Sequence, residues 1–329
     1  MHNPIYTALA ITGPTASGKT ALSLAVAKHF SAHILSCDSM QIYRKMNIGT
    51  AKATAEEQAE VPHHLIDIVD VGEPFSSSRY LEEALMVAEE LSRKGIPLLF
   101  VGGTGLYLDT LRAYTLPEVP KSDPGHIEDI RARFCDENGE LSLDALHDYL
   151  ESIDSESAGK IHKNNVRRVL RAIEIYECAD LAKSELDRRS RETQGPFSIV
   201  EITLDAHNRQ TLYDRIDMRV DKMLEEGLLD EVRAMRDEGL FDGDSTARQA
   251  IGYKEMLSYL EGESTLEEAT ELLKRSSRRY AKRQLTWFRA HKEAYVLYID
   301  DENGMLRDID DIVHEAILYF ENQICKRTQ

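Results

Sequence analysis

The residues with the clearest chemical potential are eight consecutive ones near the N-terminus. Residues 13–20 read GPTASGKT and match the phosphate-loop pattern G-x-x-x-x-G-K-[ST] at every fixed position. In such a loop, backbone N–H groups and the N-terminus of the following helix surround phosphate oxygens. Lys19 adds a point charge, and the Thr20 hydroxyl can bind Mg²⁺. The predicted phosphate site comprises Gly13, Pro14, Thr15, Ala16, Ser17, Gly18, Lys19 and Thr20.

Two polar residues follow apolar runs that are typical of strands. Asp38 comes directly after residues 33–37, and Thr104 follows two glycines at the end of residues 96–101. Because parallel strands end at one edge of a sheet, we expect both side chains to face the phosphate loop. Asp38 can then accept a proton from a nucleophile that attacks a phosphate-bearing ligand, unless it is a solvent-facing turn residue. Gly102 and Gly103 permit a close backbone approach, and Thr104 supplies a hydroxyl donor.

The expected site lacks a clear carboxylate for nucleotide hydrolysis. In most phosphate-loop ATPases and GTPases the comparable strand ends in an aspartate that orders Mg²⁺. No acid follows Val101 here, and the nearest rivals are Asp67 and Asp70. The sequence therefore favours phosphate binding without ATP hydrolysis.

Arg215 and Arg219 lie one helical turn apart and share a helix face. They can clamp a second side of a diphosphate. They can equally be surface arginines beside Asp217 and Asp221, and the spacing leaves both interpretations open.

Alternating strands and helices predict an α/β fold, with a phosphate loop in a doubly wound parallel sheet. Strands are expected at residues 8–11, 33–37, 96–101, 197–204 and 295–299, with 64–71 as a strand or an edge. Helices are expected at 21–30, 80–94, 209–238 and 309–324, and from the capping box Ser264-x-x-Glu267 to Trp287. The Trp287 side chain is expected to pack in the core.

Residues 114–196 show no convincing strand. Pro117, Pro120 and Pro124 mark the start of this segment, and Gly195-Pro196 marks its end. Helices are expected there at 126–137, 142–151, 164–178 and 181–191. The predicted organisation is a phosphate-loop core in two parts, 1–113 and 197–329, with a helical insertion domain at 114–196.

The charge of the chain is strongly negative but uneven. A net charge of −18 argues against nucleic-acid binding. However, residues 157–173 carry five Lys or Arg, residues 274–292 carry eight, and neither segment contains Asp or Glu. Each segment alone can be a solvated helix face, whereas together they favour contact with a polyanion. No apolar run approaches 18 residues, so no membrane span is expected.

The four cysteines lie far apart without a C-x-x-C pair, so free thiols in the cytosol and no zinc site are expected. The adjacent histidines His63 and His64 suggest a structural role more than a metal site. A monomer is expected.

Seven sequence motifs, which follow one another along the chain, resemble those of the tRNA dimethylallyltransferase family, also called tRNA isopentenylpyrophosphate transferases. The resemblance covers nearly the whole chain, and DSMQIY, GGTGLY and AKRQLTWFR are its specific parts. The matching segments are GPTASGKT (13–20), SCDSMQIYRKMNIGTAK (36–52), PHHLIDI (62–68), VGGTGLY (101–107), RIDMRVDKMLEEGLLDEV (215–232), QAIGYKE (249–255) and RRYAKRQLTWFR (278–289).

The resemblance implies transfer of a dimethylallyl group from dimethylallyl diphosphate to N6 of adenosine 37, next to the tRNA anticodon, with Mg²⁺ as cofactor. It implies that the phosphate loop holds the diphosphate leaving group. Asp38 then contacts N6 and acts as the base, Thr104 lies near the diphosphate, and Arg219 binds it. The zinc finger of eukaryotic members is absent, so the chain resembles the bacterial type.

The resemblance also implies that the helical insertion grips the anticodon stem-loop. The family pattern Q-R-x-x-R appears here with Arg167 in place of the glutamine. The implied tRNA-binding residues are Asp38, Ser39, Met40, Gln41, Arg167, Arg168, Arg171, Gln249, Gly252, Lys254 and Arg283.

Three other functions share some of these features. A phosphate-loop small-molecule kinase would share the loop and Asp38 but would not need the basic segments. An adenylate isopentenyltransferase would use a free nucleotide as acceptor, which the basic segments disfavour. A non-catalytic RNA-binding protein would not need Asp38 and Thr104 beside the loop.

Overall fold

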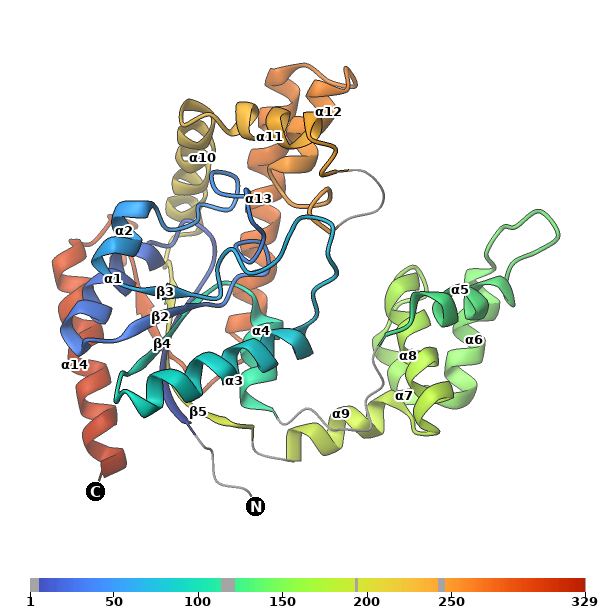
Figure 1. Ribbon diagram of the computed structural model, residues 1–329, viewed down its shortest axis with the longest axis horizontal. Helices are drawn as coiled ribbons and strands as arrows, with labels where there is room; N and C mark the ends of the chain where they lie inside the picture. Colours follow the sequence, from blue (N-terminus) through green and yellow to red (C-terminus); the bar gives the residue numbers. More distant parts are fainter. Residues whose placement is uncertain (1–5, 114–121, 193–194, 242–245, 329) are drawn as a thin grey trace. The chain divides into compact units, whose positions relative to one another are not determined.

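The computed structural model describes residues 6–113, 122–192, 195–241 and 246–328. In these ranges six parallel strands form one sheet in the order β3-β2-β4-β1-β5-β6 (Figure 1). The strands are β1 (Tyr6–Thr12), β2 (His33–Ser36), β3 (His63–His64), β4 (Leu98–Gly102), β5 (Phe197–Asp205) and β6 (Tyr295–Tyr298). The predicted α/β class is confirmed.

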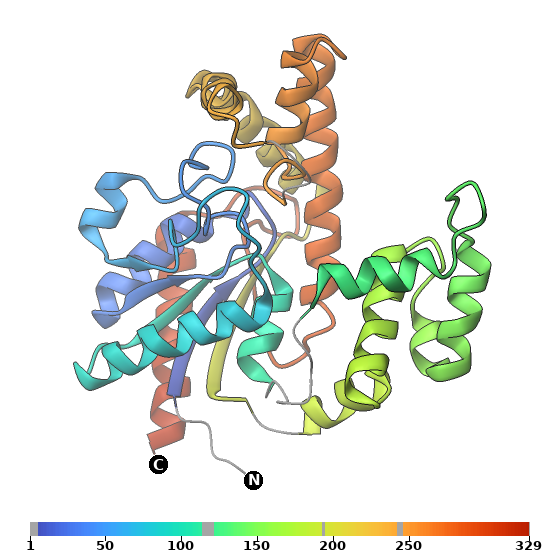
Figure 2. The ribbon, with the colours of Figure 1, turned by 45° about the vertical axis from the view of Figure 1, so that its right-hand side comes forward.

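The central strand β1 shows why the sheet is buried on both faces. Leu9 and Ile11 belong to one hydrophobic cluster, whereas Ala8 and Ala10 belong to another. Successive side chains of a strand point to opposite faces, so an uninterrupted apolar run fills two cores. Helices α1 (Lys19–Phe30) and α14 (Ile309–Thr328) cover the first face, and α3 (Ser77–Arg93) and α4 (Gly105–Arg112) cover the second (Figures 1 and 2).

A third cluster lies beyond the carboxyl ends of the strands. It includes Met46 from the loop after β2 and the fully buried Tyr253 and Met256. The helices of this layer are α10 (Arg209–Glu225), α11 (Leu228–Asp237), α12 (Tyr253–Leu260) and α13 (Leu266–Phe288). The short helix α2 (Ala55–Glu60) has no buried residue and contributes none to this cluster. Helix α13 links the two layers, because its Leu273 belongs to this third cluster and its Leu285 belongs to the cluster on the α1 face of the sheet (Figure 2).

Residues 112–196 form a separate compact unit. Its helices are α5 (Pro124–Ala132), α6 (Leu143–Ile153), α7 (Ser155–Lys160), α8 (Val166–Ala179) and α9 (Lys183–Glu192). They enclose their own core, in which Ile130, Leu146 and Ile173 are fully buried. The buried Glu174 accepts a hydrogen bond from the Asp123 backbone N–H at 2.6 Å and pairs with Arg171. The described part of this unit contains no strand.

Several expected elements differ from the structure. The helix expected at 209–238 is two helices, because Gly227 between them adopts φ of 100°. The capping box of α13 lies one residue later than expected, at Thr265 and Glu268. The strand expected at 64–71 is only the two-residue β3, which ends at His64. Leu65 and Asp67 have φ of 61° and 53°, values that extended strands do not adopt. The helix expected at 126–137 ends at Ala132.

The helices α2, α4, α7 and α12 are not anticipated by the sequence pattern; each has at most eight residues. His64 pairs with His33, with 2.9 Å between ring nitrogens, and the Trp287 ring packs on Phe288 in the core, as expected. None of the helices in the described ranges is both long and apolar enough to cross a membrane.

Candidate active site

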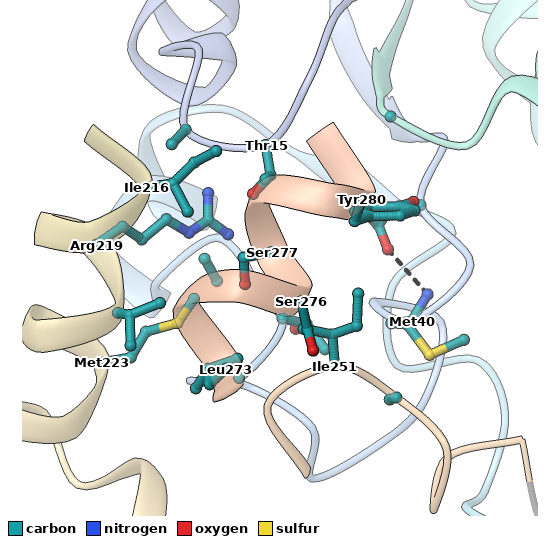
Figure 3. Close-up of a pocket in the computed structure, with 18 of the residues that line it drawn as sticks. Thr15, Met40, Ile216, Arg219, Met223, Ile251, Leu273, Ser276, Ser277 and Tyr280 are labelled. Carbon is teal, nitrogen blue, oxygen red and sulfur yellow. Dashed lines mark hydrogen bonds between the residues drawn. The ribbon is translucent and has the colours of Figure 1, made fainter. Parts of the chain in front are cut away.

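A cavity of about 1100 Å³ lies at the carboxyl edge of the sheet. The phosphate loop and the end of β2 form one part of its wall, and α10 and α13 form another (Figure 3). Segments 49–51 and 246–251 complete the lining. This is the edge where the sequence places a ligand, since side chains from several parallel strands and their loops converge there.

The phosphate loop leads from β1 into α1, as its pattern predicts. The Lys19 ammonium donates to the carbonyl oxygens of Gly13 and Pro14 at 3.1 and 2.7 Å. Ala16 adopts φ of 62°, a conformation that costs free energy for a residue with a side chain. The Arg215 side chain supports this turn, because its Nε donates to the Ala16 carbonyl at 2.7 Å.

Three cations gather around the loop. Burial and the charge of Arg219 lower the pKa of Lys19 to about 7, and the charge of Asp38 opposes them. Burial also lowers the pKa values of Arg215 and Arg219. These pKa values fall mainly because burial removes water from the three cations, and for Lys19 also because the charge of Arg219 lies near. A bound anion would replace the stabilisation that the lost water gave. The site is therefore suited to an anionic ligand.

Asp38 lies directly after β2 and is held by its own backbone. Its Oδ1 accepts from the N–H groups of Met40 at 2.9 Å, the bond dashed in Figure 3, and of Gln41 at 3.4 Å. Oδ2 has no hydrogen-bond partner among the described residues. The carboxylate lines the cavity and acts electrostatically on both Lys19 and Arg219. It faces the phosphate loop, as expected, and is no solvent-facing turn residue.

Thr104 connects the ends of β2 and β4. Its Oγ1 accepts from the Ser39 N–H at 3.0 Å, and its own N–H donates to the Cys37 carbonyl at 3.1 Å. A Cβ on Gly102 would lie 2.1 Å from the Cys37 carbonyl oxygen, so this glycine makes room for the protein's own backbone. Thr104 fixes the backbone that carries Asp38.

Gln284 of α13 is a part of the site that the sequence analysis does not single out. Its Oε1 accepts from the Thr15 N–H, and its Nε2 donates to the Gly103 carbonyl, both at 2.9 Å. A Cβ on Gly103 would lie 2.2 Å from Nε2. The side chain is only 6% exposed. Gln284 thus ties the phosphate loop to β4; the motif AKRQLTWFR contains it but does not indicate this role.

The two arginines of α10 both line the cavity. The alternative was that they are surface arginines paired with Asp217 and Asp221, but both aspartates pair with residues of α13 instead. Asp217 binds Arg278 of α13 at 2.5 Å, and Asp221 binds Lys274 at 2.7 Å. Of the two interpretations of the Arg215 and Arg219 pair, the structure favours the one at the phosphate site.

The loop from 41 to 52 is held by two charged groups that the sequence analysis passes over, the half-buried Glu231 and the buried Lys52. Glu231 of α11 accepts from the backbone N–H groups of residues 47–49 at 2.9–3.2 Å and from the Tyr253 hydroxyl at 2.6 Å. Lys52 binds Asp67 at 2.6 Å. Asp70 pairs with Arg44. Neither Asp67 nor Asp70 lines the cavity, so neither is the metal-ordering carboxylate that the sequence left as a rival.

Most of the residues that the resemblance assigns to tRNA binding lie in the core unit. Met40, Gln249, Lys254 and Arg283 line the cavity, together with Ser39 and Gln41. Gly252 does not line it; its N–H donates to Glu255 at 2.8 Å, and it is the N-cap residue directly before α12. The remaining three belong to α8 of the other unit, where Arg167 and Arg168 are exposed and Arg171 pairs with Glu174.

Comparison with known proteins decides the family. The model of the family described as "IPP transferase" matches residues 41–291. A tRNA dimethylallyltransferase of Halalkalibacterium halodurans is 47% identical over 89% of this chain and 90% of the relative. The chain belongs to the IPP transferase family.

Members of this family also match along their full length and in structure. A tRNA dimethylallyltransferase of Clostridioides difficile is 43% identical over 95% of this chain and 97% of its own. The solved tRNA isopentenylpyrophosphate transferase of Bacillus halodurans superposes with a TM-score of 0.70 at 41% identity, over 98% of both chains. A eukaryotic dimethylallyltransferase acting on tRNA superposes with a TM-score of 0.76 at 30% identity, over 89% of this chain and 74% of the other.

A metal site in this IPP transferase would need few protein ligands. The described ranges hold no group of three or more His, Cys, Asp or Glu side chains suited to a metal. The exposed Thr20 lines the cavity at the start of α1. Mg²⁺ commonly keeps several waters and binds substrate phosphates with one or two protein oxygens, so a Thr20 hydroxyl beside a bound diphosphate fits this ion.

Proposed function

We propose that this chain transfers a dimethylallyl group from dimethylallyl diphosphate to N6 of adenosine 37 in tRNA. The observation that carries the proposal is the half-buried cation cluster at the phosphate loop, with one backbone-held carboxylate, Asp38, in the same cavity. A diphosphate can form ion pairs with the cations, and an acceptor amine can donate a hydrogen bond to the carboxylate. The family membership supplies the identity of the donor and the acceptor.

In this reaction the cations act on the leaving diphosphate and Asp38 acts on the attacking amine. The N6 amine attacks C1 of the donor, so that the N6–C1 bond forms while the C1–O bond breaks. The diphosphate leaves with the bonding electron pair, and Lys19 and Arg219 stabilise its growing charge. The N6 proton passes to Asp38, which accepts it as a general base. Thr104 holds the backbone on which Asp38 stands.

Mg²⁺ is part of this proposal through Thr20. The ion would be held by the Thr20 hydroxyl and by diphosphate oxygens, and it would neutralise charge on the leaving group. The loop N–H groups and the side chains of Arg215 and Arg219 bind and orient the diphosphate independently of it.

Adenosine must leave the base stack to reach Asp38, as in enzymes that modify bases within folded nucleic acids. The exposed arginines of α8 and α13 would contact the phosphates of the anticodon stem-loop and position it. A tRNA acceptor places the reaction in the cytoplasm.

A transfer assay tests the function directly. The protein is incubated with Mg²⁺, labelled dimethylallyl diphosphate and an unmodified stem-loop with adenosines at positions 36 to 38, while AMP and ATP serve as parallel acceptors. We expect label in the stem-loop and none when position 37 is guanosine. Label in AMP would instead indicate an adenylate isopentenyltransferase, and ATP-dependent phosphorylation without prenyl transfer would indicate a kinase.

A pair of lysine variants separates the loop from general charge effects. Lys19→Ala should weaken diphosphate binding, because it removes one charge from the cation cluster. Lys28→Ala changes the same residue type on the same helix, where Lys28 pairs at the surface with Glu60, and should leave diphosphate binding intact. Equal binding by both variants would remove Lys19 from the site.

A further inference from the structure

Tyr280 is an aromatic side chain in the cavity for which the mechanism above has no role. It lies on α13, one helical turn before Gln284, and lines the cavity. Figure 3 shows Tyr280 and Met40 toward one side of the cavity and Arg219 and Met223 toward the other. The ring therefore lies away from the α10 side of the cavity.

The surroundings of Tyr280 connect it to the acceptor side of the reaction. Burial raises the pKa of the Tyr280 phenol most, the charge of Asp38 raises it further, and a hydrogen bond with the Thr104 side chain lowers it. Asp38 is the residue that must meet N6 of the adenine. A purine whose N6 reaches Asp38 would thus bring its ring system next to Tyr280.

The neighbours of Tyr280 on α13 extend this arrangement toward solvent. The Arg283 guanidinium lies over the Tyr280 ring, 5.6 Å from its centroid. Arg279 and Arg283 are exposed, line the cavity, and form no ion pair with the described residues. Carboxylate, aromatic ring and unpaired arginines are the three groups that an extruded nucleotide requires for its amine, its base and its phosphates.

We propose that Tyr280 is the stacking platform for the extruded adenine and so positions N6 against Asp38. This inference rests on the proposed function and names a positioning residue for it. Every base has an aromatic face, and stacking on an aromatic side chain needs no hydrogen bond, so the ring and not the hydroxyl is the essential part.

Three variants test the proposal: Tyr280→Phe keeps the ring, Tyr280→Leu removes it, and Tyr319→Leu is the matched control. Tyr319 lies on α14, where its ring stacks on Tyr295 at 4.4 Å. We expect Tyr280→Leu to raise KM for the stem-loop about 5- to 150-fold, the range for loss of one base–aromatic stack, with KM for dimethylallyl diphosphate unchanged. Tyr280→Phe and Tyr319→Leu should resemble the wild type.

A fluorescence measurement reports on the stack itself. The probe is a stem-loop with 2-aminopurine at position 37, whose emission is quenched when the base stacks. In complexes at saturating protein, we expect quenched emission with the wild type and Tyr280→Phe and bright emission with Tyr280→Leu. A change in folding alone would not produce this pattern, because the Phe variant restores the signal.

Three outcomes would overturn the inference. Equal KM and equal emission for Tyr280→Leu and wild type would show that no base stacks there. A loss shared by Tyr280→Phe would assign the effect to the hydroxyl. A fall in kcat with unchanged stem-loop KM and emission would mean that the ring faces the allylic group. Failure of wild-type transfer would refute the proposed function instead, and the fluorescence result would still stand separately.

Discussion

Replacement of Gln284 by leucine should detach the phosphate loop from the central sheet while leaving the shape of α13 intact. Leucine is close to glutamine in volume, but it can neither accept from the Thr15 N–H nor donate to the Gly103 carbonyl. Both bonds are 2.9 Å long in the structure. The perturbation therefore removes two hydrogen bonds and little packing.

The two lost bonds differ in cost. The Gly103 carbonyl is buried, so leaving it unpaired costs about 1–3 kcal/mol. The Thr15 N–H lies at the cavity wall, where water can replace the lost partner, and it costs about 0.5–1.5 kcal/mol. The sum of about 1.5–4.5 kcal/mol corresponds to a fall in melting temperature of roughly 3–18 °C, at about 2–4 °C per kcal/mol for a unit of this size.

Thermal melting and donor binding together check this reasoning. Gln210→Leu makes the same chemical change at an exposed position of α10, where the Gln210 side chain donates to Asp214 at the surface, and it should melt like the wild type. For Gln284→Leu we also expect weaker binding of dimethylallyl diphosphate, because the Thr15 amide is no longer held. If Gln284→Leu melts and binds the donor like the wild type, the side-chain bridge contributes nothing to the site.

Three further predictions concern the base, the RNA contact and the pH dependence of stability. Asp38→Asn keeps an oxygen for the Met40 N–H but removes the proton acceptor, so single-turnover transfer should slow about 10²–10⁴-fold at unchanged donor affinity; wild-type rates would refute the base assignment. Arg168→Ala should reduce the slope of log K against log salt for stem-loop binding by about 0.7–0.9, and an unchanged slope would exclude this contact. Burial lowers the pKa values of His33 and His64, so the unfolded chain takes up protons that the folded chain does not, and stability should fall as pH drops below about 6.5. Melting curves at about pH 7.5 and pH 5.5 should show this fall, and it should be smaller in His64→Phe.

The parts of the fold that follow from sequence are those whose causes are local. The apolar run at β1 and the glycine loop after it predict a strand, a turn and a helix, because their residues are neighbours in the chain. The bond between Gln284 and Thr15 spans 269 residues, and that between Glu231 and Asn47 spans 184. Such contacts depend on how α13 and α11 dock on the sheet, which no local pattern reports. The sequence therefore predicts the phosphate loop, but not the side chains of Gln284 and Glu231 that hold the loops of the site in place.

The basic segment at 274–292 shows why a count of charges does not predict a binding surface. Lys274 and Arg278 lie one turn apart and pair with Asp221 and Asp217 of α10. Arg275, Arg279 and Arg283 follow the same spacing one residue later, are exposed, and form no ion pair with the part of the chain that the structure describes. The sequence alone is compatible with a solvated helix face and with contact with a polyanion. The structure shows that one face of α13 instead packs against α10 through ion pairs, while the face with Arg275, Arg279 and Arg283 stays exposed. A net charge of −18 is compatible with RNA binding because Asp217 and Asp221 of α10 are already paired on the other face of α13, away from the three exposed arginines.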